Sequence, residues 1–119
     1  MYVIDVHWKG NAMVIIETSI FTRRVTELLS DDEYRELQSI LVENPEKGAI
    51  IPGGGGLRKI RWSGYGHGKR AGTRTIYYWA TAKKQILMLF IYAKKERDEL
   101  TPDQRKVLRQ IVEKEYHER

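Results

Sequence analysis

Two basic side chains, Lys59 and Arg61, lie two residues apart in the segment LRKIRW, which has the composition of a short β-strand. Successive side chains of a strand point to opposite faces, so Lys59 and Arg61 share one face while Ile60 and Trp62 share the other. Cations held together on a rigid sheet are suited to binding a phosphate group and stabilising the extra charge of its transition state. Arg74, in the next strand-like segment, joins them if the strands pair in chain order.

RNA is a substrate that such a cluster can cleave without a metal or a cysteine. The 2′-hydroxyl is the nucleophile, so the protein has to orient it in line, stabilise the phosphorane and move protons. An arginine can only stabilise charge, so proton transfer falls to Lys59 or Lys94, or to Tyr92 or His67. The alternative role for any single cation is contact with a backbone phosphate, which positions RNA without chemistry. The candidate catalytic residues are Lys59, Arg61, Arg74, Lys94, Lys95 and Tyr92.

Charge is unevenly distributed along the chain. Residues 47–95 contain eleven Lys or Arg and no Asp or Glu, whereas the rest contains ten Lys or Arg against all sixteen acids. Uncompensated cations repel one another, so a basic centre of this kind indicates a polyanionic partner, the alternative being a surface kept basic for solubility. The cations lie among strand-like segments and glycine-rich turns, which favours nucleic acid over a membrane surface. Further candidates for RNA binding are Arg58, Lys69, Arg70, Lys83 and Lys84.

Several classes of protein are disfavoured by what the sequence lacks. Its 119 residues include no cysteine, which excludes disulfides and thiol nucleophiles and is compatible with the cytoplasm, where we expect the protein. The three histidines lack metal-ligand spacing, so neither a metal nor another cofactor is expected. The longest apolar run, residues 86–93, is far shorter than the roughly 20 residues of a membrane helix, so no membrane association is expected.

The pattern of apolar residues predicts one α+β domain over residues 13–119. Residues 1–12 are expected to be an N-terminal extension, either a tag or a poorly ordered segment. A helix capped by Thr18 or Ser19 follows the first strand, Ser30 and Glu33 form a capping box for a second helix, and Thr101 caps the last. The order is β-α-α-β-β-β-α, and the expected packing is a small antiparallel sheet with its helices on one face. The predicted strands are residues 13–17, 57–63, 73–80 and 85–93.

The glycine-rich connection, LRKIRW, GKRAGTRTIYYW, IYAKKE and TPDQR together resemble the RelE/ParE superfamily of toxins, specifically its HigB-like branch. The resemblance runs from about Ile16 to Glu115. It implies a RelE-like fold and a ribosome-dependent endoribonuclease that cleaves mRNA in the 30S A site by metal-independent 2′-hydroxyl attack. It also implies a cognate HigA-like helix-turn-helix antitoxin, with operator DNA bound only through the toxin–antitoxin complex.

The resemblance also implies roles for individual residues. Lys59 and Arg61 match the paired basic positions of the family's K-x-[KR] strand, Arg74 matches the arginine that opens the next strand, and Lys95 or Lys94 matches the basic residue that closes the last one. A tyrosine that assists cleavage in some members follows the last strand, where this chain has Leu100, so Tyr92 or a neighbour would have to substitute.

Two other functions are compatible with the same fold, because a fold does not fix an activity. The first is that of a ParE-like inhibitor of DNA gyrase, which would not need the constellation of Lys59, Arg61 and Arg74. The second is a non-catalytic RNA-binding module, since contacts to backbone phosphate use the same residue types.

Overall fold

The computed structural model describes residues 1–62 and 72–117, which form an α+β domain. Within this part of the chain, six strands build one sheet in the order β1-β2-β6-β5-β4-β3. The strands are β1 (Tyr2–Trp8), β2 (Asn11–Glu17), β3 (Ala49–Ile50), β4 (Arg58–Trp62), β5 (Thr73–Ala80) and β6 (Gln85–Ala93). The helices are α1 (Ser19–Leu28), α2 (Asp31–Glu43) and α3 (Pro102–Val112), with a 3-10 turn η2 (Thr81–Lys83) between β5 and β6 and a π-helical turn η3 (Glu113–His117) after α3.

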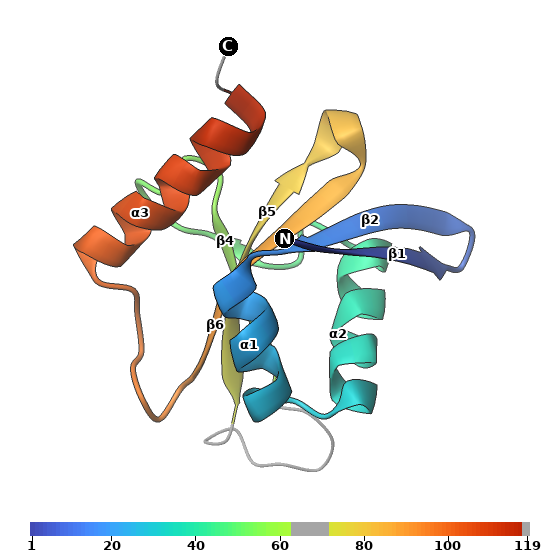
Figure 1. Ribbon diagram of the computed structural model, residues 1–119, viewed down its shortest axis with the longest axis horizontal. Helices are drawn as coiled ribbons and strands as arrows, with labels where there is room; N and C mark the ends of the chain where they lie inside the picture. Colours follow the sequence, from blue (N-terminus) through green and yellow to red (C-terminus); the bar gives the residue numbers. More distant parts are fainter. Residues whose placement is uncertain (63–71, 118–119) are drawn as a thin grey trace.

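The helices cover both faces of the sheet. Helices α1 and α2 lie on one side and α3 lies on the other (Figure 1). One hydrophobic cluster joins α1 and α2 to the sheet, and includes Phe21, Leu37 and Ile86. A second cluster joins α3 to the opposite face, and includes Leu57, Ile76 and Leu108. Strand β6 contributes to both clusters, as expected of a strand that is apolar nearly throughout.

The α+β class is confirmed, and three details differ from the expected packing. Strand β2 pairs parallel to β6, so the sheet is mixed, although β4, β5 and β6 form the expected antiparallel meander. Helix α3 packs on the face opposite α1 and α2, whereas all helices were expected on one face. Two strands, β1 and β3, were not predicted. The first of them lies within residues 1–12 and pairs along its whole length with β2.

Side-chain caps begin each helix where the sequence indicates. The Thr18 hydroxyl accepts a hydrogen bond from the Phe21 N–H at the start of α1. Ser30 and Glu33 form a reciprocal capping box at α2, and Thr101 forms one with Gln104 at α3. Each of these caps satisfies backbone N–H groups that have no partner inside the helix.

A β-bulge in β6 decides which side chains share a face. Ile76 pairs with Phe90 and Tyr77 pairs with Met88, so Leu89 is the extra residue of β6. A bulge shifts the alternation of the strand by one position. Leu89 and Tyr92 therefore both pack in the cluster on the α3 face, although they are an odd number of positions apart in the strand.

Tyr77 fixes the loop that leads into β3. Its side chain is fully buried, its hydroxyl accepts a hydrogen bond from the Gly48 N–H at 2.9 Å, and it donates one to the Pro45 carbonyl at 2.7 Å. A Cβ on residue 48 would lie 2.7 Å from the Tyr77 ring, so only glycine allows this approach. The Gly48 carbonyl in turn accepts a hydrogen bond from Arg58 at 2.8 Å. The loop is thereby held against β4, the strand that carries Lys59 and Arg61.

We expect Tyr77→Phe to lower the free energy of unfolding by about 1–3 kcal/mol, because a buried N–H and a carbonyl lose their partner while the ring still fills its space. Urea denaturation followed by circular dichroism measures the change. The matched control is Tyr2→Phe, since Tyr2 is 58% exposed and should be neutral. Equal urea midpoints for Tyr77→Phe and the unmodified chain would contradict the role of this hydroxyl.

Candidate nucleic-acid interface

The meander β4-β5-β6 brings the predicted basic residues of two strands onto one face. Arg61 lies directly opposite Arg74, and Arg74 lies directly opposite Tyr92. Lys59 lies opposite Ile76 in the next row. Direct cross-strand partners share a face, and Ile76 and Tyr92 pack on the α3 side, so all of these side chains lie on that side. We call Lys59, Arg61, Arg74 and the adjacent Lys94 the cationic face.

The pairing of Arg61 with Arg74 is unfavourable for folding alone. Side chains directly opposite each other in an antiparallel pair are close neighbours, and like charges in such positions destabilise the sheet. Neither arginine forms an ion pair with a described acidic residue. A bound anion would compensate both charges at once, which makes the pair a candidate anion-binding site.

Arg74 is the most unusual cation of this face because it is 7% exposed. A buried charge is costly unless it is paired. Within the described part of the chain, its guanidinium makes one hydrogen bond, from Nη1 to the Thr73 carbonyl at 3.2 Å. An arginine has five N–H donors, so most of those of Arg74 have no partner among the described residues and are available to an anion there. Arg61 is exposed and Lys59 is half-buried, which makes the face accessible from solvent at Arg61.

A turn after β6 holds Lys94 and Lys95 at the same end of the sheet. The Lys94 N–H donates to the Gly72 carbonyl at 3.0 Å, which keeps Lys94 beside the start of β5. Glu96, the nearest acid in sequence, accepts hydrogen bonds from the Ala93 N–H and from Arg24. The Ala93 N–H, together with the charge of Arg24, lowers the pKa of Glu96. Glu96 is thus committed to other partners, and the side chains of both lysines are exposed.

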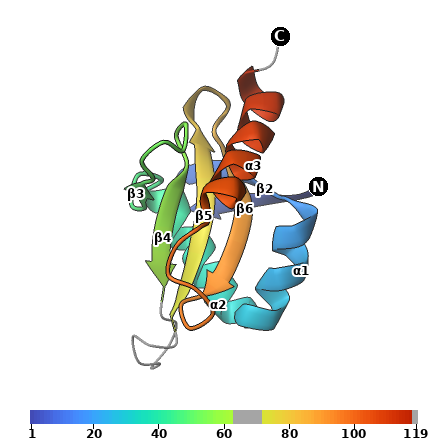
Figure 2. The ribbon, with the colours of Figure 1, turned by 90° about the vertical axis from the view of Figure 1, so that its left-hand side faces the viewer.

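Tyr92 is fully buried rather than open to a substrate. Its hydroxyl donates to the Asp98 carbonyl at 3.3 Å, in the connection between β6 and α3 that runs on the α3 side of the sheet (Figure 2). Burial raises the pKa of Tyr92, although the charges of Arg74 and Arg97 oppose this effect. Tyr92 therefore lies beside Arg74 on the neighbouring strand, with its hydroxyl hydrogen-bonded to the main chain and away from solvent.

The connection and α3 add residues that the sequence did not assign to the site. A cavity of about 40 Å³ lies beside Lys59 and Tyr92, and Glu99, Leu100 and Arg105 also line it. This volume suits an ordered water and is too small for a nucleotide. The sequence predicts that Arg105 lies in the last helix. It does not predict that Arg105 lies near the sheet, because this position depends on the path of the connection between β6 and α3.

The other predicted RNA-binding residues lie elsewhere. Arg58 alternates with Lys59 and points to the opposite face, where its guanidinium donates to the Glu46 and Gly48 carbonyls. Lys83 and Lys84 lie at the connection between β5 and β6, at the far end of these strands from Arg74. Lys69 and Arg70 lie outside the described residues, as does His67.

No group of three or more His, Asp or Glu side chains in residues 1–62 and 72–117 is arranged to hold a metal ion. In the same part of the chain, no helix has the length and apolar character needed to cross a membrane.

The chain matches a protein-family model over most of its length. The model describes the RelE toxin of the RelE/RelB toxin–antitoxin system, and it matches residues 13–118. The match runs from Met13 within β2 through η3 and therefore includes every residue of the cationic face, whereas β1 lies before it.

Proposed function

Because the chain belongs to the RelE toxin family, the toxin component of toxin–antitoxin systems, we propose that it is a ribosome-dependent endoribonuclease that cleaves mRNA. The observation that carries this proposal is the direct pairing of Arg61 with Arg74, beside Lys59 and without an acidic partner among the described residues. Such a site attracts a phosphodiester. It stabilises the transition state more than the ground state, because the phosphate carries additional charge in the transition state.

The proposed reaction uses only groups of the RNA and of the protein. The 2′-oxygen attacks the adjacent phosphorus while the bond to the 5′-oxygen of the next nucleotide breaks, which leaves a 2′,3′-cyclic phosphate and a 5′-hydroxyl. Arg61 and Arg74 stabilise the phosphorane oxygens. Lys59 or Lys94 handles the protons, one leaving the 2′-hydroxyl and one arriving at the 5′-oxygen. The buried hydroxyl of Tyr92 is a weaker candidate for proton transfer than either lysine.

The proposal includes partners. We propose a HigA-like helix-turn-helix antitoxin that neutralises the toxin in the cytoplasm, and operator DNA that is bound only through the toxin–antitoxin complex. The ribosome would supply the geometry of the mRNA in its 30S A site, since the cavity of about 40 Å³ that the described residues form beside Lys59 is too small for a nucleotide. Assignment to the HigB-like branch is part of the same proposal.

One experiment separates this function from its two alternatives. The chain is induced in a bacterium, and the 5′ ends of mRNA are mapped alongside DNA breaks. Codon-phased mRNA cuts that disappear in Lys59→Ala and Arg74→Ala support the proposal. Gyrase-dependent DNA breaks with intact mRNA would instead identify an inhibitor of DNA gyrase. RNA binding without cuts or breaks would identify a non-catalytic module.

The matched controls are Lys114→Ala and Arg23→Ala. Each variant removes one exposed cation that is not part of the cationic face, so each should leave the cut pattern unchanged. Loss of cutting in the controls as well would show that total charge, and not the cationic face, governs the activity.

A further inference from the structure

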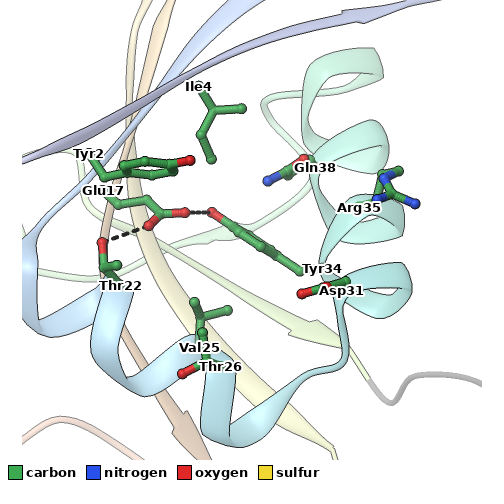
Figure 3. Close-up of a pocket in the computed structure, with 10 residues that line it drawn as sticks. All are labelled: Tyr2, Ile4, Glu17, Thr22, Val25, Thr26, Asp31, Tyr34, Arg35 and Gln38. Atoms are coloured by element: carbon green, nitrogen blue, oxygen red, sulfur yellow. Dashed lines mark hydrogen bonds between the residues drawn. The ribbon is translucent and has the colours of Figure 1, made fainter.

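A second polar site lies on the opposite side of the sheet, between the β1-β2 hairpin and helices α1 and α2. A pocket of about 380 Å³ opens there (Figure 3). It is lined by Tyr2, Ile4, Glu17, Thr22, Val25, Thr26, Asp31, Tyr34, Arg35 and Gln38. Its volume is at the small end of ligand pockets and suits a single side chain or a small molecule. Neither the cationic face nor its proposed reaction uses any of these residues.

The floor of this pocket is a buried carboxylate. Glu17 is 2% exposed, and its two carboxylate oxygens each accept one hydrogen bond, from the Thr22 hydroxyl at 2.6 Å and from the Tyr34 hydroxyl at 2.5 Å. Gln38 contributes a hydrogen bond to Tyr34. Figure 3 shows Thr22, Tyr34 and the ring of Tyr2 gathered around this carboxylate.

This carboxylate has hydroxyl donors but no cation. None of the ion pairs among the described residues includes Glu17, and Arg35, the cation that lines the pocket, pairs instead with Asp32 at 3.1 Å. Burying a charge without an opposite charge is costly, and neutral donors compensate that cost only in part. Each carboxylate oxygen also retains acceptor capacity after one hydrogen bond. The carboxylate can therefore accept further hydrogen bonds, and a positively charged donor would compensate its charge most fully.

We propose that this pocket binds a guanidinium group. A guanidinium is planar, carries five N–H donors and stacks on aromatic rings, and the pocket offers a partner for each property. Glu17 and Asp31 provide carboxylates, Thr26 provides a hydroxyl acceptor, and the exposed ring of Tyr2 provides a face for a cation–π contact. Ile4 supplies an apolar wall for an alkyl stem. This inference does not depend on the proposed nuclease function.

Binding is measured by following backbone amide shifts in the nuclear magnetic resonance spectrum of the full chain as ethylguanidinium is added. We expect saturable shifts confined to the pocket, for example at Ile4, Thr26 and Gln38. Ethylurea has nearly the same shape without the charge, so it should bind about tenfold more weakly or not at all. Shifts that do not saturate, or that ethylurea reproduces, would refute the proposal.

The variant Glu17→Gln should weaken ethylguanidinium binding by about tenfold or more, since it removes the buried charge. Glu27→Gln is the matched control, because Glu27 is exposed on α1 outside the pocket. Should Glu17→Gln not fold, the exposed Asp31 and Tyr2 provide the test, with Asp31→Asn and Tyr2→Ala each expected to weaken binding several-fold. Unchanged affinity in the folded variants would overturn the proposal.

A guanidinium can come from free arginine or from an arginine side chain within a polypeptide. The same titration with L-arginine and with N-acetyl-arginine-N-methylamide separates these sources, because only the free amino acid carries the charged α-ammonium and α-carboxylate groups. Tighter binding of the blocked form indicates an arginine of a protein partner, and tighter binding of L-arginine indicates a metabolite. Failure of both to bind in the pocket counts against the guanidinium assignment itself.

Discussion

Arg74→Ala is expected to lower the rate of mRNA cleavage by about 10²–10³-fold, the effect of removing one preorganised donor from a site that stabilises transition-state charge. The expectation rests on the burial of Arg74, on the one hydrogen bond that its guanidinium makes among the described residues, and on its position directly opposite Arg61. Cleavage of a defined mRNA on purified ribosomes, measured in single turnover, gives the rate without the effects of toxicity in cells.

The variant should remain folded, because Arg74→Ala also relieves the repulsion between two adjacent cations. Arg74→Lys retains the charge but loses the planar fork of donors, so its rate should lie between those of Arg74→Ala and the unmodified chain. Arg23→Ala, with the same change on the exposed surface of α1, is the control and should cleave normally. A folded Arg74→Ala that cleaves at more than about a third of the normal rate would remove Arg74 from the reaction.

The strands of the cationic face were predictable because their patterns are local. The segments 57–63, 73–80 and 85–93 correspond to β4, β5 and β6 within one residue at each end, and alternation alone puts Lys59 and Arg61 on one face. The same alternation separates Arg58 from them, so its assignment to the RNA-binding group did not follow from the pattern. The caps at Thr18, Ser30 and Thr101 are equally local signals.

The residues that surround the cationic face could not be predicted in the same way, because their positions depend on contacts between segments that are far apart in the sequence. Strand β6 is apolar on both faces, so its sequence contains no alternation in which the bulge at Leu89 could be detected, and this bulge directs Tyr92 toward α3. The side on which α3 packs is set by the path of the connection after β6. Because that connection covers Tyr92 and brings Arg105 near Lys59, neither position could be foreseen.

The N-terminal strand β1 could not be predicted for a different reason. Residues 1–12 carry no signal that distinguishes a strand from an extension, and β1 becomes stable by pairing with β2 and packing Ile4 and Val6 against the core. The pocket at Glu17 depends on this strand, since Tyr2 and Ile4 form part of its lining. Its carboxylate and its hydroxyl donors come from β2, α1 and α2, so no local sequence pattern contains the site.

Binding of RNA to the cationic face is expected to weaken steeply with salt. Each phosphate neutralised by a cation releases counterions, and for single strands the slope of log affinity against log salt is about −0.7 per contact. If the four cations of the face each contact one phosphate, the slope is about −3, which corresponds to a loss of about 50-fold in affinity between about 50 and 200 mM salt. Fluorescence anisotropy with a labelled 2′-O-methyl RNA measures this slope, because that RNA cannot supply the nucleophile and stays intact.

The slope also tests which cations make these contacts, independently of cleavage. Arg61→Ala should reduce its magnitude by about 0.7, since Arg61 is exposed and one contact is lost, whereas Lys114→Ala should leave it unchanged. A slope near zero, or one that Arg61→Ala does not alter, would mean that RNA is not held by phosphate contacts on this face. Two arginines paired across adjacent strands repel each other, which lowers the stability of the free protein. A bound polyanion would offset this repulsion, so the arrangement is favourable when RNA is bound.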